Sequence, residues 1–235
     1  MKQGSSNVDT ATQVRGPGWP EILAGGAAYL ASIGLVVLLL PLISEPVVQG
    51  NVALLASGLM GIIALAVVVL IRIRGLEPFG FRRARPLHLV VGAGLGVLAY
   101  GLGIVAALVY TALTGQAENV QEGYQAAAAG GWLSLALAIV AGALITPLGE
   151  EGFFRGVLAN ALLARYGAWV GVLVSAAVFA VAHGINPILP VAFVVGVMTA
   201  LLFRWSGSIW PGVVLHGVNN AVALIIPLMV GVADA

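Results

Sequence analysis

The chain has 235 residues, of which 60% are hydrophobic and only 8% are charged, and its formal net charge is +1. Water-soluble domains contain about 25% charged residues, so a soluble fold could not bury this much apolar surface, and the small net charge without a basic stripe excludes a nucleic-acid partner. The sequence has no cysteine, which excludes disulfides, thiolate catalysis and cysteine-ligated metals and leaves His, Asp and Glu as possible ligands.

The amino-terminal segment, residues 1–20, is polar and rich in Gly, Ser and Thr. Such a composition cannot bury enough apolar area to order itself, so we predict a disordered tail. The apolar run that follows, Ile22–Ile43, is too long for the core of a signal peptide. It is predicted to be the first transmembrane helix.

Further apolar segments follow along the whole chain, and a membrane-spanning helix needs roughly 20 such residues. After the first helix the candidates are Val52–Ile71, Leu87–Leu113, Trp132–Ala164, Ala168–Ala182, Val191–Phe203 and Ile209–Val230. The sequence therefore predicts an all-α, polytopic transmembrane bundle of about seven or eight helices. It forms one domain over residues 21–235 and has the lipid bilayer as its partner.

The distribution of basic residues predicts the orientation in the membrane. One loop is rich in arginine, whereas the flanking loops carry only acidic charges, at Glu45, Glu118 and Glu122. The arginines of this loop are Arg72, Arg74, Arg82, Arg83 and Arg85. By the positive-inside rule the loop and the amino terminus are cytoplasmic, in what we expect to be a prokaryotic plasma membrane.

The segment Trp132–Ala164 is unusually long. As one straight helix it would measure about 50 Å, against about 30 Å for the hydrocarbon core. Pro147 and Gly149 predict a break, with a new helix starting near Glu150. A break here would open the site to the cytoplasm, whereas an unbroken helix would move it toward the outer leaflet.

Ionisable residues in spanning segments are costly and by default mark function. Glu150, Glu151 and Arg155 form the first group, and the spacing of four lets Glu151 and Arg155 meet on one helix face. Arg155 also follows Glu150 by five residues, so one glutamate is neutralised and the other is left free. The structural alternative is a buried ion pair that only fixes helix packing.

Two further groups follow, and each has a spacing of four that places its end residues on one helix face. Phe179 is followed by His183, and His216 by Asn220. The midpoint between Glu150 and His183 falls at Tyr166 and Gly167, so two antiparallel helices joined there would hold both side chains at the same depth.

These residues include the parts that amide hydrolysis requires. Water held between a carboxylate and an imidazole can be deprotonated, which makes Glu150 and His183 a candidate pair. A second histidine and an amide, here His216 and Asn220, can donate to an oxyanion.

The three motifs Glu-Glu-x-x-x-Arg, Phe-x-x-x-His and His-x-x-x-Asn occur here in order, so the chain resembles the CAAX prenyl endopeptidases of the Ras-converting type and their bacterial relatives, the CPBP or Abi family of intramembrane proteases. The resemblance covers a protease-like core over residues 132–230. It implies that Glu150 and His183 activate water, that His216 and Asn220 bind the oxyanion, and that Glu151 and Arg155 support the site. The implied substrate is a membrane-associated protein or peptide.

Other functions stay open at this point. Intramembrane Glu and His residues also relay protons in transporters, and a non-catalytic immunity or binding protein could share the fold. Glu150, His183 and His216 would also suit a zinc site with an open position for water. We favour a mechanism without a cofactor, with zinc as the alternative.

Overall fold

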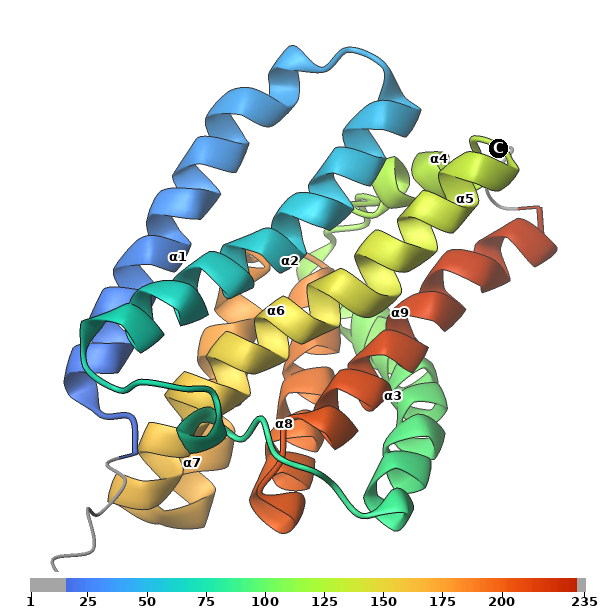
Figure 1. Cartoon of the computed structure of the whole chain (residues 1–235). Coiled ribbons are helices and arrows are strands. Elements are labelled where there is room, and N and C mark those ends of the chain that lie inside the picture. The colour runs from blue at the N-terminus through green and yellow to red at the C-terminus, as the bar shows by residue number, and fades with distance from the viewer. Residues whose placement is uncertain (1–15, 232–235) are drawn as a thin grey trace, which may run out of the picture.

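The computed structural model describes residues 16–231, and the predicted tail lies largely outside this range. All regular elements of the described residues are helical, which confirms the all-α prediction (Figure 1). The long helices are α1 (Trp19–Leu39), α2 (Pro46–Ile71), α3 (Pro86–Thr114), α7 (Asn160–Ala182), α8 (Ile188–Ser206) and α9 (Trp210–Met229). The shorter elements are α4 (Glu122–Ala129), α5 (Trp132–Ile139) and α6 (Thr146–Phe153), the π-helical η3 (Val140–Ile145) and η4 (Phe154–Ala159), and the 3₁₀ turns η1 (Leu40–Leu42) and η2 (Glu77–Phe79).

Six helical segments are long and apolar enough to span a membrane. One of them, residues 132–182, has 51 residues and reverses direction at Gly167, so it makes two passes. The protein is therefore a multi-pass membrane protein. The first helix starts earlier than predicted, because Trp19 and Pro20 already belong to α1.

The predicted helix break at Pro147 and Gly149 is wrong. Elements α5, η3, α6 and η4 follow one another with helical backbone angles and form one long helix (Figure 1). The wide turn of η3 accommodates Pro147, and the N–H of Thr146 bonds to the carbonyl of Ala141, five residues earlier. Pro147 has no N–H for the carbonyl of Ala143, and α9 lies against that carbonyl at Gly217.

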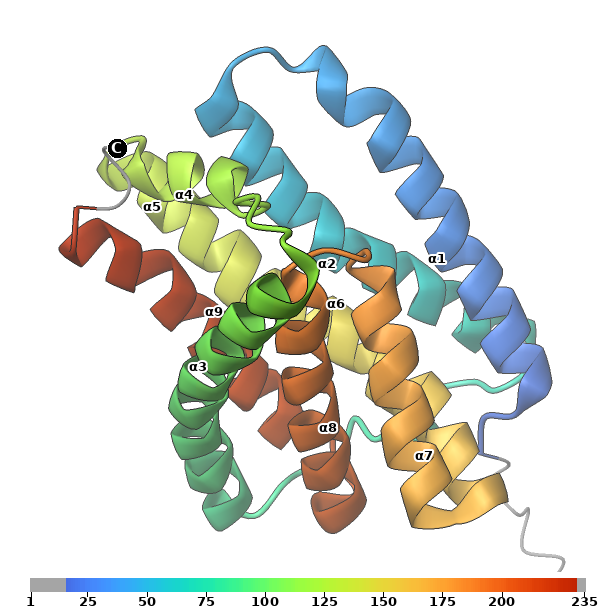
Figure 2. The same ribbon diagram turned by 180° about the vertical axis from the view of Figure 1, so that it is seen from behind.

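The chain does reverse at the predicted hairpin. Gly167 has φ 82°, a left-handed value that glycine adopts without the penalty of a Cβ atom. The hairpin sets the part of α7 after Gly167 antiparallel to the long helix, and α8 is the one helix that separates His183 from His216. Seen from behind, α3 covers α8 and α9 (Figure 2).

Small residues bring α2 against the helix that carries the glutamates. A Cβ atom at Gly58 would lie 2.6 Å from the backbone of Ile145, and one at Gly61 would collide with the carbonyl of Gly149. Lipid tails provide little hydrophobic drive for helix association, so close backbone packing of this kind stabilises the bundle. It also sets α2 directly beside Glu150.

Candidate active site

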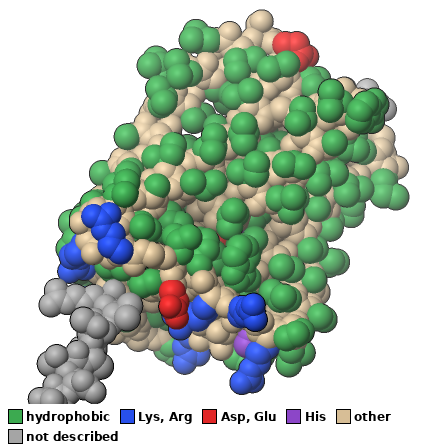
Figure 3. Space-filling model, in the orientation of Figure 1, with side chains coloured by type: hydrophobic (Ala, Val, Ile, Leu, Met, Phe, Trp, Pro, Cys, Tyr) green, Lys and Arg blue, Asp and Glu red, His purple; other side chains and the backbone are tan. Residues whose placement is uncertain are grey.

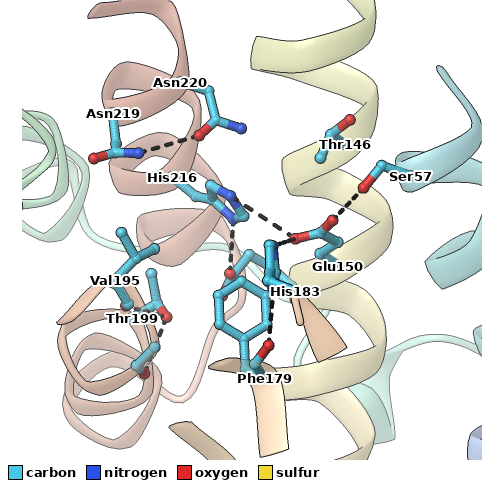
Figure 4. A network of polar contacts seen from close by, with 12 residues as sticks. Ser57, Thr146, Glu150, Phe179, His183, Val195, Thr199, His216, Asn219 and Asn220 are labelled. Carbon is cyan, nitrogen blue, oxygen red and sulfur yellow. Dashed lines mark hydrogen bonds and ion pairs between the residues drawn. The ribbon is translucent and has the colours of Figure 1, made fainter. Parts of the chain in front are cut away.

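Glu150 lies in α6 in the middle of the bundle and is 1% exposed. Its Oε1 accepts a 2.6 Å hydrogen bond from Oγ of Ser57 on α2. Its Oε2 has no hydrogen-bond partner among the described residues and faces two histidines (Figure 4). One carboxylate oxygen is thus anchored while the other is free to bind a water molecule or a proton.

His183 follows the last residue of α7 and points its ring toward Glu150 (Figure 4). Its Nδ1 is 2.8 Å from the backbone carbonyl of Phe179, and because a carbonyl only accepts, Nδ1 must donate. In the neutral ring, Nε2 therefore carries the lone pair, 3.8 Å from Oε2 of Glu150. This gap is too long for a direct hydrogen bond but suits one bridging water.

His216 lies on α9 on the other side of Glu150, with Nε2 3.9 Å from Oε2. Its Nδ1 is 3.1 Å from Oε1 of Glu151, so this imidazole also donates from Nδ1. The side chain of His216 is 5% exposed, whereas that of His183 is 26% exposed. His183 is therefore the histidine that an incoming substrate reaches more easily.

Behind His216 lies the ion pair that the spacing predicts. Nε of Arg155 is 3.0 Å from Oε2 of Glu151, and both side chains are buried. The hydrogen of this Nε is directed to Oγ1 of Thr199, at 2.7 Å. The guanidinium also lies 4.4 Å from the centroid of the Phe179 ring, a cation–π contact. Phe179 thus covers Arg155 with its ring and orients His183 with its carbonyl.

Asn220 lies one turn after His216, and its amide is held from two sides. Nδ2 donates to the carbonyl of Gly142 at 2.9 Å, and Oδ1 accepts from Nδ2 of the neighbouring Asn219 at 3.1 Å. A primary amide has two N–H groups, so Asn220 retains one donor besides the bond to Gly142.

These side chains line a cavity of about 240 Å³. Its polar lining includes Ser57, Glu150, His183, His216, Asn219 and Asn220. Its apolar lining includes Leu54, Val191, Ala192, Val195 and Leu224. Glu151 and Arg155 are not part of the lining, so they influence a bound substrate through the two lining residues that they contact, His216 and Phe179.

Helix α4 closes one side of the cavity with Tyr124 and Gln125. Burial and the nearby charge of Glu150 both raise the pKa of the Tyr124 phenol. The hydroxyl therefore stays protonated at neutral pH and is a neutral donor at the cavity wall.

Glu150, His183 and His216 are the residues that could hold a metal ion. Both Nε2 atoms lie within 4 Å of the same carboxylate oxygen, an arrangement that resembles a two-histidine, one-carboxylate site. Within residues 16–231, however, no group of three His, Asp or Glu side chains meets the geometry for holding a metal ion. The three side chains are thus of the types that bind zinc, but they are not arranged around a common metal position.

Sequence reasoning missed three residues of this network: Ser57, Thr199 and Asn219. The hydroxyls of Ser57 and Thr199 contact Glu150 and Arg155, and both lie in apolar helices where a lone hydroxyl carries little signal. Asn219 precedes the motif residue Asn220, and its position on the polar face of α9 could have indicated that it belongs to the site.

Comparison with known proteins gives one match. Residues 132–222, less than half of the chain, match the family model described as "Type II CAAX prenyl endopeptidase Rce1-like". No curated protein and no solved structure matches the chain. The matched segment extends from the start of α5 into α9 and contains all three motifs, which supports the resemblance drawn from them.

Proposed function

We propose that this protein is an intramembrane endopeptidase that hydrolyses a peptide bond of a membrane-associated protein or peptide. The match of residues 132–222 to the Rce1-like family model of type II CAAX prenyl endopeptidases supports this proposal. One observation carries the proposal. The unpaired Oε2 of Glu150 faces Nε2 of His183 at 3.8 Å in a cavity lined by both. This is the geometry of a pair that binds and deprotonates a water molecule.

In the proposed reaction, water bound between Glu150 and His183 attacks the carbonyl carbon of the scissile bond. Glu150 accepts one proton from the water as the new C–O bond forms, and the carbonyl oxygen becomes an oxyanion. The proton is then delivered to the leaving nitrogen as the C–N bond breaks, which regenerates the Glu150 carboxylate. Nδ1 of His183 remains bonded to the Phe179 carbonyl and keeps Nε2 directed at the water.

The oxyanion is stabilised by His216 and Asn220. Since Nδ1 of His216 donates to Glu151, Nε2 carries a hydrogen only when the ring is an imidazolium. In that form Nε2, which lies 3.9 Å from Oε2 of Glu150, can donate to the oxyanion. Asn220 supplies a second donor from its free N–H.

The test is Glu150→Gln in the purified protein, assayed against prenylated CAAX-type peptides and against a library of unmodified membrane peptides, with cleavage read by mass spectrometry. Glutamine still accepts from Ser57 but cannot take a proton from water, so cleavage should be lost while thermal unfolding is unchanged. His183→Ala should behave in the same way. Cleavage by Glu150→Gln at the rate of the unchanged protein would refute the mechanism.

A further inference from the structure

The exposed charges of the bundle are divided between its two ends (Figure 3). Seven exposed arginines gather at one end, on the α2–α3 loop, before the Gly167 turn and at the end of α8. They are Arg72, Arg74, Arg82, Arg83, Arg85, Arg165 and Arg204. Hydrogen bonds join these segments, because Oγ of Ser208 donates to the carbonyl of Arg82 and Nδ2 of Asn160 donates to the carbonyl of Pro78. Two acidic residues share this end: Glu77 is exposed, and Glu21 is buried and paired with Arg72 at 2.8 Å.

The opposite end consists of the α1–α2, α3–α4, α4–α5 and α7–α8 connections (Figures 1 and 2). Hydrogen bonding also joins this end, since Nδ2 of Asn51 in α2 donates to Oγ of Ser134 in α5 at 2.7 Å. Its exposed charges are acidic: Glu45, Glu118 and Glu122. No Lys or Arg among the described residues lies in these connections.

The cavity is lined from this acidic end. Gln121 and Gln125 come from the α3–α4 region, and Asn186 comes from the α7–α8 connection. Two of the deeper residues, Ser57 and Asn220, lie on the halves of α2 and α9 nearest to the same end. The arginine-rich end contributes none of the lining residues.

We propose that the cavity receives its substrate from the extracytoplasmic face of the membrane. An excess of arginine marks the cytoplasmic side of a membrane protein, so the acidic end and the cavity mouth face outward. The unbroken helix also predicts an outward-facing cavity. The cytoplasmic opening was expected only if the helix broke at Pro147 and Gly149, and it does not break there. The statement that the entering molecule is a substrate rests on the proposed function; the orientation does not.

The lining indicates the chemistry of the segment that enters. The amides of Gln121 and Gln125 can pair with the N–H and C=O groups of an extended backbone, and the walls beyond them are apolar. Asn186 is held in its own turn, where Nδ2 donates to the carbonyl of His183 and Oδ1 accepts from the N–H of Ile188. Glu118 and Glu122 flank Gln121 and favour an approach by neutral or basic flanking residues over carboxylates. The substrate class is therefore a membrane-associated polypeptide whose apolar segment is exposed outside, with neutral or basic flanks.

The orientation can be tested without an activity assay because the chain has no cysteine. Ala117→Cys at the acidic end and Leu76→Cys in the arginine loop are exposed positions, and neither change alters a charge. Each variant of the full chain, produced in bacterial cells, is treated with a membrane-impermeant maleimide before and after permeabilisation. Ala117→Cys should be labelled equally in both conditions, whereas Leu76→Cys should gain its label only after permeabilisation.

Labelling of Leu76→Cys in intact cells, or protection of Ala117→Cys until permeabilisation, overturns the proposed orientation. A third variant, Gln125→Cys, places the thiol in the lining itself and should be labelled in intact cells as Ala117→Cys is. If the labelling is as expected but Glu150→Gln retains full cleavage, the catalytic proposal fails and the orientation stands. If cleavage depends on Glu150 but Leu76→Cys is labelled in intact cells, the catalytic proposal stands and the orientation fails.

Discussion

His183 donates from Nδ1 to the backbone carbonyl of Phe179, 2.8 Å away and one helical turn earlier. The bond is local to the end of α7, so the orientation of the ring does not depend on a neighbouring helix. Because the acceptor belongs to the backbone, replacement of the Phe179 side chain leaves it in place. The spacing Phe-x-x-x-His thus joins a group that orients the imidazole to a ring that covers Arg155.

Ser57→Ala should slow turnover without greatly changing KM. The variant removes the donor to Oε1 of Glu150, and a hydrogen bond to a charged group contributes about 1.5–3 kcal/mol. If that energy is needed to hold the carboxylate in the transition state, kcat falls roughly 10- to 100-fold. Ser175→Ala is a matched control, since it removes a buried serine hydroxyl bonded only within α7. Equal effects of the two variants on kcat would show that Ser57 does not assist catalysis.

Asn220→Ala should lower kcat by roughly 10²–10³, the usual cost of one oxyanion donor. Asn219→Ala should cost less, because Asn219 contacts the oxygen of Asn220 and not the proposed oxyanion. Steady-state kinetics of both purified variants test this order. A rise in KM at constant kcat for Asn220→Ala would instead assign the residue to substrate binding.

Glu151→Gln and Arg155→Gln should each reduce stability as well as activity. Removal of one partner leaves the other charge buried and uncompensated, at a cost of about 3–5 kcal/mol. The double variant should be less harmful than the sum of the single variants, as thermal unfolding in detergent can measure. Strictly additive losses would mean that the two side chains do not interact energetically.

Chelation should leave cleavage unchanged, and elemental analysis of active protein should find no stoichiometric metal. The reason is that Glu150 and His183 can activate water without an ion. Loss of activity on chelation, restored by zinc, would contradict this and would make Glu150, His183 and His216 the ligands. Zinc bonds to such atoms are about 2.0–2.2 Å long, so Glu150 and both imidazoles would need to close around the ion.

The sequence was sufficient to predict the number and order of the spans and much of the site. Spacing of four predicted the Glu151–Arg155 ion pair, and the position of Gly167 midway between Glu150 and His183 predicted their equal depth. Both are local geometric relations that a helix imposes on its own sequence.

Contacts between distant helices could not be predicted in this way. Ser57 is 93 residues from Glu150 in the sequence, and nothing in the apolar run around it specifies which helix it faces. The course of the helix through Pro147 was also mispredicted. Proline was expected to end the helix, but the wide turn before it and the close contacts of α2 and α9 keep the segment helical.

The two π-helical turns on either side of α6 affect how helix faces are counted along this segment. A π turn takes up one residue more than an α turn, and one residue corresponds to a rotation of about 100° around the axis. Side chains before Val140 and after Ala159 are therefore rotated relative to the face that carries Glu150. A helical wheel with 3.6 residues per turn, drawn from Trp132 to Ala164, would therefore assign the residues before Val140 and after Ala159 to the wrong faces. Removing one residue within residues 140–145 would turn α5 about its axis while leaving the two glutamates where they are.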